Sequence, residues 1–484
     1  MSADSTTASQ GLLDAVIIGG GVSGLAAAWR LRSRRIVLLE SQDRLGGRLY
    51  SQRASDEDYW LNFGAHLFPA PGGVVDSMAR DVGLETLPIT GSMMGIAYKD
   101  RILTSGRVET YPLRLPLPLR EKIAFARAGL RLQRAVARYH KVLAPRPGEA
   151  EAESRRRRLA YLDDKTFADF LGALPAGTAS IFACAAHRAT AEPTSLSAGS
   201  GIGLFALVWA GEGSLIARNL VGGPSVLPEA LGTALGGRVR LGAKAQRIAP
   251  TSGGTQNVEY LVNGRVESVE ARHVIVAVPA PIAAPLIAPI SLRASESLAA
   301  ITYGPFLSMA ILTNEITAMP WDDVYALATP GRSFDMFTNH AQVLRNTSER
   351  APGGSLMVYA GGDGAAQMMT RPDSEIRETF LADLHTLYPE TRGIIAATKI
   401  HRWRLGNVYA QPGRHELQGA LEGPHGEFRN VHLAGDYFAE LGSMEAAAKA
   451  GDSAAQHVEL SLAQRHGSAP RMGLEDVGAD GVVD

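Results

Sequence analysis

The stretch between residues 14 and 48 constrains the fold of this chain most strongly. Apolar residues 15–18 predict a buried strand, residues 25–32 predict a helix, and a second apolar run ends at Glu40. A Gly-x-Gly-x-x-Gly sequence joins the first strand to the helix. Because two parallel strands need a crossover of about this length, the pattern predicts a β-α-β unit and an α/β fold.

Each glycine of this sequence has its own steric role. Gly19 permits a tight turn, Gly21 lets the backbone approach a pyrophosphate, and Gly24 lets the helix pack closely on the strand. The helix N-terminus would face the phosphates. Glu40 follows Gly19 by 21 residues and is placed to accept a hydrogen bond from a ribose hydroxyl. We therefore predict a dinucleotide site here.

A second motif, Arg44-Leu45-Gly46-Gly47-Arg48, directly follows the second strand. Its glycines give backbone freedom, and its arginines supply positive charge for phosphate. The motif resembles the Arg-x-Gly-Gly-Arg of the FAD-dependent flavin amine oxidase superfamily, which includes monoamine oxidases, protoporphyrinogen oxidases and carotenoid desaturases. This resemblance implies that Arg48 reaches the FAD phosphates.

The C-terminal part of the chain resembles the same family. Residues 431–451 read as a short strand that ends at Gly435-Asp436, followed by the start of a helix. In the family this segment closes over the cofactor. The resemblance places Gly435 and Asp436 at the pyrophosphate or ribityl chain, and the backbone of Ser443 and Met444 at the flavin ring. A helix N-terminus there suits the negative charge of reduced flavin.

Two weaker segments complete the resemblance. Residues 236–245 resemble the strand pair that brackets the adenine near Ala245, and residues 273–279 resemble the following strand-to-proline step. Some members attach FAD through a cysteine nine residues after a tryptophan; counted from Trp403, that position is Pro412, which implies non-covalent FAD. The predicted cofactor-binding residues are Gly19, Gly21, Ser23, Gly24, Glu40, Ser41, Arg44, Gly47, Arg48, Gly64, Ala65, His66, Ala245, Trp403, Gly435, Asp436, Ser443 and Met444.

The resemblance also implies two domains, each built from separated segments. A Rossmann-like FAD-binding domain would comprise residues 14–90, 222–290 and 400–465. An α+β substrate-binding domain with a helical part would comprise residues 91–221 and 291–399. The polar ends, residues 1–13 and 466–484, are predicted to be disordered.

The composition excludes several other classes of protein. The chain has 484 residues, enough for two domains with sizeable cores, and its net charge of −1 gives no reason to expect nucleic acid as a partner. The single cysteine, Cys184, lies in an apolar run and predicts a buried side chain, with neither an intramolecular disulfide nor a cysteine metal cluster. The histidines show no metal-ligand spacing. No signal peptide or membrane span is evident, so we expect a cytoplasmic protein of undetermined oligomeric state.

A basic segment precedes the middle of the chain. Residues 120–142 predict a helix in which arginines line one face. The residues that can contribute its apolar face are Ile123, Leu130, Ala135, Val136 and Tyr139. Residues 145–158 read as an exposed charged linker. We interpret the basic face as solvated; the alternative is docking to a membrane surface or an anionic partner.

The chain carries one Gly-x-Gly-x-x-Gly after a strand, so no second nucleotide domain for NAD(P)H is predicted. The chemistry that remains is hydride removal from a small organic substrate by flavin, with O₂ or another acceptor taking the electrons. Two bonds compete as the site of oxidation. One is a C–N bond, as in amine oxidases. The other is a C–C bond, as in desaturases.

The sequence departs from amine oxidases at three positions. By motif alignment, the two tyrosines of their substrate cage correspond to Gly413 and Ser443, and a lysine that holds a water near the flavin corresponds to Ser308. Residues 64–68, Gly-Ala-His-Leu-Phe, instead resemble a motif of plant-type carotenoid desaturases. We therefore favour C–C desaturation, such as beside a carbonyl of a cyclic substrate. Amine oxidation is the alternative, and a non-catalytic flavoprotein is a minor one.

Two residues are candidates for catalysis. His66 would lie beside the flavin by resemblance and could act as a base or hydrogen-bond donor; its alternative role is to satisfy loop backbone. Tyr409 could face the substrate and donate or abstract a proton; its alternative role is core packing. Trp403 is expected to pack under the cofactor rather than react.

Overall fold

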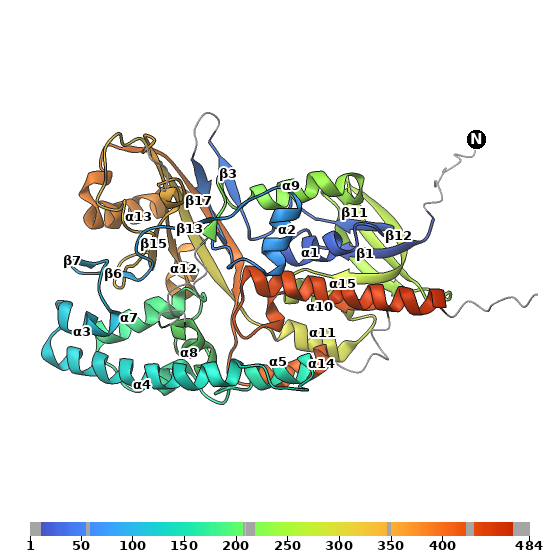
Figure 1. Cartoon of the computed structure of the whole chain (residues 1–484), viewed down its shortest axis with the longest axis horizontal. Helices are drawn as coiled ribbons and strands as arrows, with labels where there is room; N and C mark the ends of the chain where they lie inside the picture. Colours follow the sequence, from blue (N-terminus) through green and yellow to red (C-terminus); the bar gives the residue numbers. More distant parts are fainter. Residues whose placement is uncertain are drawn as a thin grey trace, which may run out of the picture.

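The computed structural model describes residues 11–54, 59–206, 209, 218–345, 350–422 and 430–467. The predicted disordered ends lie largely outside these residues. The chain forms two large sheets and a helical part, with one sheet at each end of the molecule (Figure 1). Among the described helices, none is long and apolar enough to cross a membrane.

The first sheet contains the predicted β-α-β unit. Strand β1 (Leu13–Ile18) pairs in parallel with β2 (Ile36–Leu39) on one side and with β12 (Arg265–Val276) on the other. Further parallel strands are β9 (Val239–Arg240) beside β2 and β18 (Val431–Leu433) beside β12. The antiparallel strands β10 (Lys244–Pro250) and β11 (Gln256–Val262) extend it from β12. Residues 236–245 therefore supply two strands that pair with different partners rather than with each other.

Both faces of this sheet are buried, because alternate residues of β1 enter different cores. Ala15 and Ile17 pack under α1 (Val22–Arg30), α2 (Val74–Asp81), α9 (Val226–Leu235) and α15 (Met444–Gly467). Val16 and Ile18 pack toward α10 (Ala280–Ile287) and α11 (Leu292–Ala299). The period of two in a strand thus explains why the whole apolar run is buried.

The second sheet is mixed. Its order is β17 (Ile395–Val408), β13 (Tyr303–Thr313), β16 (Gly354–Ala360), β15 (Met336–Asn339), β14 (Ala326–Ala328), β6 (Gly95–Tyr98) and β7 (Arg101–Leu103). Helix α13 (Asp373–Leu387) packs on it. The predicted domain boundary at residue 400 needs correction, because it falls inside β17, which pairs with β13 along its length.

The hairpin of β3 (Ser51–Arg53) and β4 (Trp60–Asn62) leads from the first sheet to the second. Ser308 on β13 donates a hydrogen bond to the Phe63 carbonyl at 2.9 Å, just after β4. The loop after this hairpin therefore lies where the two sheets approach each other.

The helical part packs around α4 (Leu119–Leu143), which runs along one edge of the molecule (Figure 1). Helix α4 contacts α6 (Phe167–Leu171), α7 (Ala176–His187) and α8 (Ala198–Ala206). The helix predicted over 120–142 is confirmed, but Ile123 and Leu130 are exposed rather than buried; the buried face is Ala128, Leu132, Ala135, Val136 and Tyr139.

The interpretation of residues 145–158 as an exposed linker was wrong in part. Residues Glu151–Leu159 form helix α5, although nothing in their composition gives an apolar face. Ion pairs fix it instead: Arg157 pairs with Glu149, and Arg155 pairs with Glu422 after α14 (Arg414–Leu421). Cys184 is buried, as predicted.

Candidate active site

The glycine loop between β1 and α1 has the geometry that a bound dinucleotide requires. Gly19 has a φ of +103°, and a Cβ built on Gly24 would lie 1.8 Å from the Gly19 carbonyl oxygen. Neither position accepts a side chain. A Cβ on Gly21 would instead meet nothing within 4 Å. Open space therefore lies above Gly21, at the N-terminus of α1, where a phosphate would bind.

Two polar side chains flank this loop. Ser23 is 5% exposed, and its Oγ has no hydrogen-bond partner among the described residues. A buried hydroxyl without a partner is costly, and a phosphate oxygen would satisfy it. Glu40 accepts a hydrogen bond from the Gly20 N–H at 2.6 Å and from the Gln42 N–H at 2.8 Å. Ser41 donates its hydroxyl to the same carboxylate at 3.2 Å.

The loop of residues 44–48 lies directly against the glycine loop. The Gly46 N–H donates to the Gly20 carbonyl at 2.8 Å, and Gly47 adopts a φ of +56° with its Cβ position 3.3 Å from Gly21 Cα. Arg44 stabilises the loop through two contacts. Its guanidinium lies 3.8 Å from the Tyr50 ring centroid and donates a hydrogen bond to the Gly47 carbonyl at 3.0 Å.

Arg48 joins the N-terminal and C-terminal motifs. Its Nη2 lies 2.8 Å from Asp436 Oδ2, and its Nη1 donates to the Gly406 carbonyl at 3.3 Å. Burial lowers the pKa of the guanidinium, but the charge and hydrogen bond of Asp436 outweigh that effect and raise it. Arg48 therefore carries a fixed positive charge beside the predicted phosphate position.

The C-terminal motif begins α15 as predicted. Gly435 precedes Asp436, and Ser443 caps the helix by accepting a hydrogen bond from the Ala446 N–H at 3.1 Å. Met444 is the first helical residue and is buried. In the same turn, Glu445 accepts from the Val74 N–H at 2.9 Å, which fixes the start of α2 against α15.

The loop of residues 64–66 connects the cofactor motifs to the second sheet. A Cβ on Gly64 would lie 2.1 Å from the Arg48 carbonyl oxygen, and the Ala65 N–H donates to that oxygen at 3.0 Å. Trp403 donates its indole N–H to the Phe63 carbonyl at 2.8 Å. The predicted residues Arg48, Gly64, Ala65 and Trp403 are thus brought together by direct contacts.

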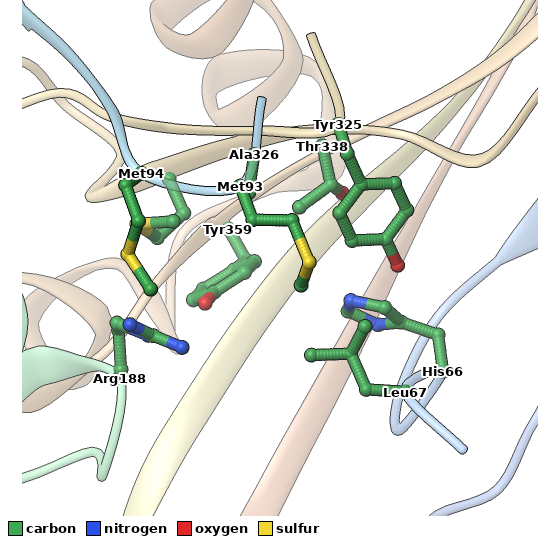
Figure 2. A pocket seen from close by; sticks show the side chains of 10 residues that line it. His66, Leu67, Met93, Met94, Arg188, Tyr325, Ala326, Thr338 and Tyr359 are labelled. Carbon is green, nitrogen blue, oxygen red and sulfur yellow. The ribbon is translucent and has the colours of Figure 1, made fainter. Parts of the chain in front are cut away.

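A cavity of about 50 Å³ opens beside this loop (Figure 2). Its wall is largely apolar and includes three methionines and two tyrosines. The lining residues are His66, Leu67, Met93, Met94, Arg188, Tyr325, Ala326, Met336, Thr338 and Tyr359. None of these is acidic. His66 lies on the opposite side of the cavity from Arg188 (Figure 2).

His66 is held as a neutral base. The Gly64 carbonyl can only accept, so His66 Nδ1, 2.8 Å away, carries the proton and Nε2 keeps the lone pair. Burial lowers the pKa of His66 to about 4, with a further lowering by the charge of Arg188 and an opposing effect of the Gly64 hydrogen bond. The His340 ring packs edge-on at 4.6 Å between centroids.

A second polar group completes this wall. The Tyr325 hydroxyl points toward His66 in Figure 2 and has no hydrogen-bond partner among the described residues. His340 Nδ1, also buried, is likewise without one among them. Tyr325 lines the cavity and its hydroxyl is therefore available to a bound molecule, whereas His340 is not among the lining residues.

Two predicted residues lie elsewhere. The Ala243 N–H donates a hydrogen bond to the Glu40 carbonyl at 2.8 Å. Ala245 follows two residues later and therefore lies on the Glu40 side of the glycine loop. Tyr409 packs against the helical cluster of α4, α6, α7 and α8 and does not line the cavity. Its catalytic role stays a prediction, and the geometry favours the packing role.

Sequence reasoning missed Arg188, Tyr325 and Tyr359. Arg188 follows α7, whereas Tyr359 is on β16 and Tyr325 precedes β14, so no local motif links them. Their chemistry was visible in the sequence, but their meeting at one cavity was not.

The fold and this site define a flavoprotein with one dinucleotide-binding domain, and the open glycine loop and unpartnered Ser23 hydroxyl fit FAD. The sequence pattern of flavin-containing amine oxidoreductases matches residues 22–459, and the chain belongs to this family of FAD-dependent oxidoreductases.

Several known proteins resemble the chain. Chloroplastic protoporphyrinogen oxidase 1 of Spinacia oleracea is 24% identical over 429 residues, which cover 78% of this chain and 71% of that protein. Flavin-containing amine oxidase A of Canis lupus familiaris is 32% identical over 119 residues, 24% of this chain and 21% of that protein. The solved structure of cyclohexylamine oxidase from Brevibacterium oxydans shares 18% identity with a TM-score of 0.74, covering 94% of this chain and all of that one. The last likeness concerns the fold.

Proposed function

We propose that the protein catalyses the dehydrogenation of a C–C bond in a small organic substrate that carries a carbonyl group. The observation that carries this proposal is the neutral His66 on the wall of the cavity, with its lone pair on Nε2. When bound, FAD supplies the hydride acceptor, and the position of Pro412 supports its non-covalent attachment.

Desaturation beside a carbonyl requires a base, because one carbon loses a proton and its neighbour loses a hydride. His66 is suited to take the proton, since it is neutral over the physiological pH range and lies on the loop that is bonded to the Arg48 carbonyl. The Tyr325 hydroxyl, without a partner among the described residues, can hold the substrate carbonyl oxygen as negative charge develops on it.

The absence of an acidic residue from the described lining argues against a cationic amine as substrate. The three departures from amine oxidases point the same way. Ser308 is turned to the Phe63 carbonyl, Gly413 begins α14 with its N–H bonded to the Asp163 carbonyl, and Ser443 caps α15. All three residues make hydrogen bonds within the fold, and none of them supplies an aromatic wall for a substrate amine.

C–N oxidation remains the second candidate. It is favoured by the local similarity to flavin-containing amine oxidases, which reaches 33% identity over 107 residues for amine oxidase B of Homo sapiens. An amine substrate would have to bind in its neutral form in this cavity, because Arg188 opposes a positive charge there.

The test is anaerobic mixing of the holoenzyme with cyclic ketones, keto acids and primary and secondary amines, followed by the flavin absorbance near ~450 nm. Ketones or keto acids should bleach it and amines should not. His66→Gln should slow bleaching by about 10²- to 10⁴-fold, whereas His140→Gln, an exposed control on α4, should not change it. Bleaching by amines alone, at the same rate in His66→Gln, would contradict the proposal.

A further inference from the structure

The charge of the cavity is concentrated in one side chain. Among the lining residues, Arg188 is the only one that is ionised at neutral pH, since the pKa of His66 is lowered to about 4. The Arg188 guanidinium and the Tyr359 hydroxyl both line the cavity and lie on the same side of it, opposite His66 (Figure 2), and the charge of Arg188 lowers the pKa of that hydroxyl against the larger raising effect of burial. Tyr359 is itself 7% exposed. Arg188 itself is half-buried, and the two side chains form the polar end of a largely apolar wall.

The two carboxylates that flank the preceding residue, His187, bond to that imidazole rather than to Arg188. Asp335 lies 2.6 Å from His187 Nδ1 and accepts from the Gly361 N–H at 2.9 Å. Glu192 lies 2.9 Å from His187 Nε2. Within the described part of the chain, no carboxylate forms an ion pair with Arg188. A guanidinium on an apolar cavity wall with no carboxylate in direct contact keeps its donors available to an anion.

The turn that carries Arg188 is held rigidly. His187, the last residue of α7, is fixed by the two carboxylates on either side of its ring. The backbone beyond it is packed against two glycines. A Cβ on Gly304 would lie 1.9 Å from the Thr190 carbonyl oxygen, and one on Gly361 would lie 2.1 Å from the His187 carbonyl oxygen. A preorganised guanidinium loses little freedom when it binds a ligand.

We propose that Arg188 and the Tyr359 hydroxyl bind the carboxylate of the substrate, and that Arg188 therefore determines specificity for small carboxylic acids. The planar guanidinium can form two parallel hydrogen bonds to a carboxylate. The apolar side chains of Met93, Met94 and Met336 would contact the hydrocarbon part, and the reacting carbons would lie toward His66. This inference rests on the proposed function and narrows its substrate class.

Binding can be measured separately from oxidation, through the change in flavin absorbance when the holoenzyme is titrated with unreactive probes. The probes are benzoate and butanoate, with benzamide and butanamide as uncharged counterparts and benzylamine as a cation. We expect both carboxylates to bind saturably and at least about tenfold more tightly than their amides, because charge-assisted hydrogen bonds are the stronger ones.

Three variants locate the effect. Arg188→Met should weaken benzoate binding by roughly 10- to 100-fold and leave benzamide binding nearly unchanged. Arg188→Lys should lose less of the benzoate affinity, since lysine keeps the positive charge but cannot form two parallel hydrogen bonds. Arg293→Met, which removes an exposed arginine of α11 outside the cavity lining, should bind benzoate as the unmodified protein does. Flavin content and melting temperature check that each variant folds.

Two results would overturn the inference. One is benzoate binding that is equal in the unmodified protein and in folded Arg188→Met. The other is an unmodified protein that binds amides or benzylamine as tightly as the carboxylates. The proposed function fails separately: if amines alone bleach the flavin while benzoate binding still depends on Arg188, the anion site stands and the desaturation does not.

Discussion

Arg48 and Asp436 are separated by nearly the whole chain, yet Arg48 Nη2 lies 2.8 Å from Asp436 Oδ2. Asp436 is 5% exposed, and its neighbour Gly435 ends the segment after β18. The ion pair closes the flavin-binding domain, because it ties the Arg-x-Gly-Gly-Arg loop to the segment that precedes α15. It also fixes the direction in which Arg48 presents its charge.

Asp436→Asn should therefore weaken both folding and cofactor binding. We expect a loss of about 1 to 3 kcal/mol in the free energy of unfolding of the apoprotein, less than for a fully buried pair because the Arg48 side chain is 30% exposed. Denaturant titration and the ratio of flavin to protein absorbance measure the two effects. Asp452→Asn weakens a pair with Arg30 in which both side chains are about one-third exposed (33% and 30%), and it should cost less than about 1 kcal/mol with full flavin content. Equal losses of stability and flavin content in Asp436→Asn and Asp452→Asn would show that the Arg48–Asp436 ion pair does not close the flavin-binding domain.

The glycine loop allows folding and cofactor binding to be separated. Gly21→Ala should leave the apoprotein within about 0.5 kcal/mol of the unmodified protein, since the backbone there is extended and a Cβ meets nothing within 4 Å. It should nevertheless abolish FAD binding, because the methyl group occupies the space for the pyrophosphate. Gly24→Ala should destabilise the apoprotein by at least about 2 kcal/mol through its clash with the Gly19 carbonyl. Thermal melts with and without FAD distinguish them; full FAD occupancy in Gly21→Ala would place the cofactor elsewhere.

Ser23 offers a finer test of the same site. Its hydroxyl has no partner among the described residues, so Ser23→Ala removes no hydrogen bond from the apoprotein and should leave its stability unchanged. FAD affinity should fall about 10- to 100-fold, the value of one hydrogen bond to a charged group. Ser51→Ala is the matched control: Ser51 Oγ accepts from the Ser225 N–H at 3.1 Å, so stability should fall by about 1 kcal/mol with FAD affinity retained. Isothermal titration of apoprotein with FAD gives the affinities, and the reverse pattern would be inconsistent with a phosphate at Ser23.

His187 should make stability depend on pH in the alkaline range. Burial lowers the pKa of this imidazole, but hydrogen bonds and charge from Asp335 and Glu192 outweigh it and raise the pKa to about 10. A raised pKa in the folded state contributes stability that is complete below about pH 6.5 and is lost as the pH rises through about 10. His187→Gln should thus be about 2 to 4 kcal/mol less stable at pH 6, with the gap narrowing by pH 10. Denaturant titrations at pH 6, 8 and 10 measure it, with exposed His140→Gln as control. A gap that stays constant with pH would show that His187 is not charged in the folded protein.

Much of the flavin domain was readable because its signals are local. The strand of residues 15–18, the glycine spacing and the later helix at residue 444 each follow from a few consecutive residues and their steric demands. By contrast, residues 145–158 were misread since their helix depends on partners such as Glu422, far along the chain. The domain boundary at residue 400 failed for the same reason, because β17 is defined by its pairing with β13.

The sequence alone determined the class of cofactor and the family, and it predicted the residues that approach the dinucleotide, since glycine positions and charge are properties of short segments. The tertiary structure alone decided which side chains share the cavity beside the loop of residues 64–66. His66 follows the β3–β4 hairpin, Arg188 follows α7, and Tyr359 lies on β16. They meet because the turn after α7 packs against Gly304 and Gly361 of the second sheet. Such long-range packing leaves no periodic or local signal in the chain, which is why this cavity became visible only in the folded protein.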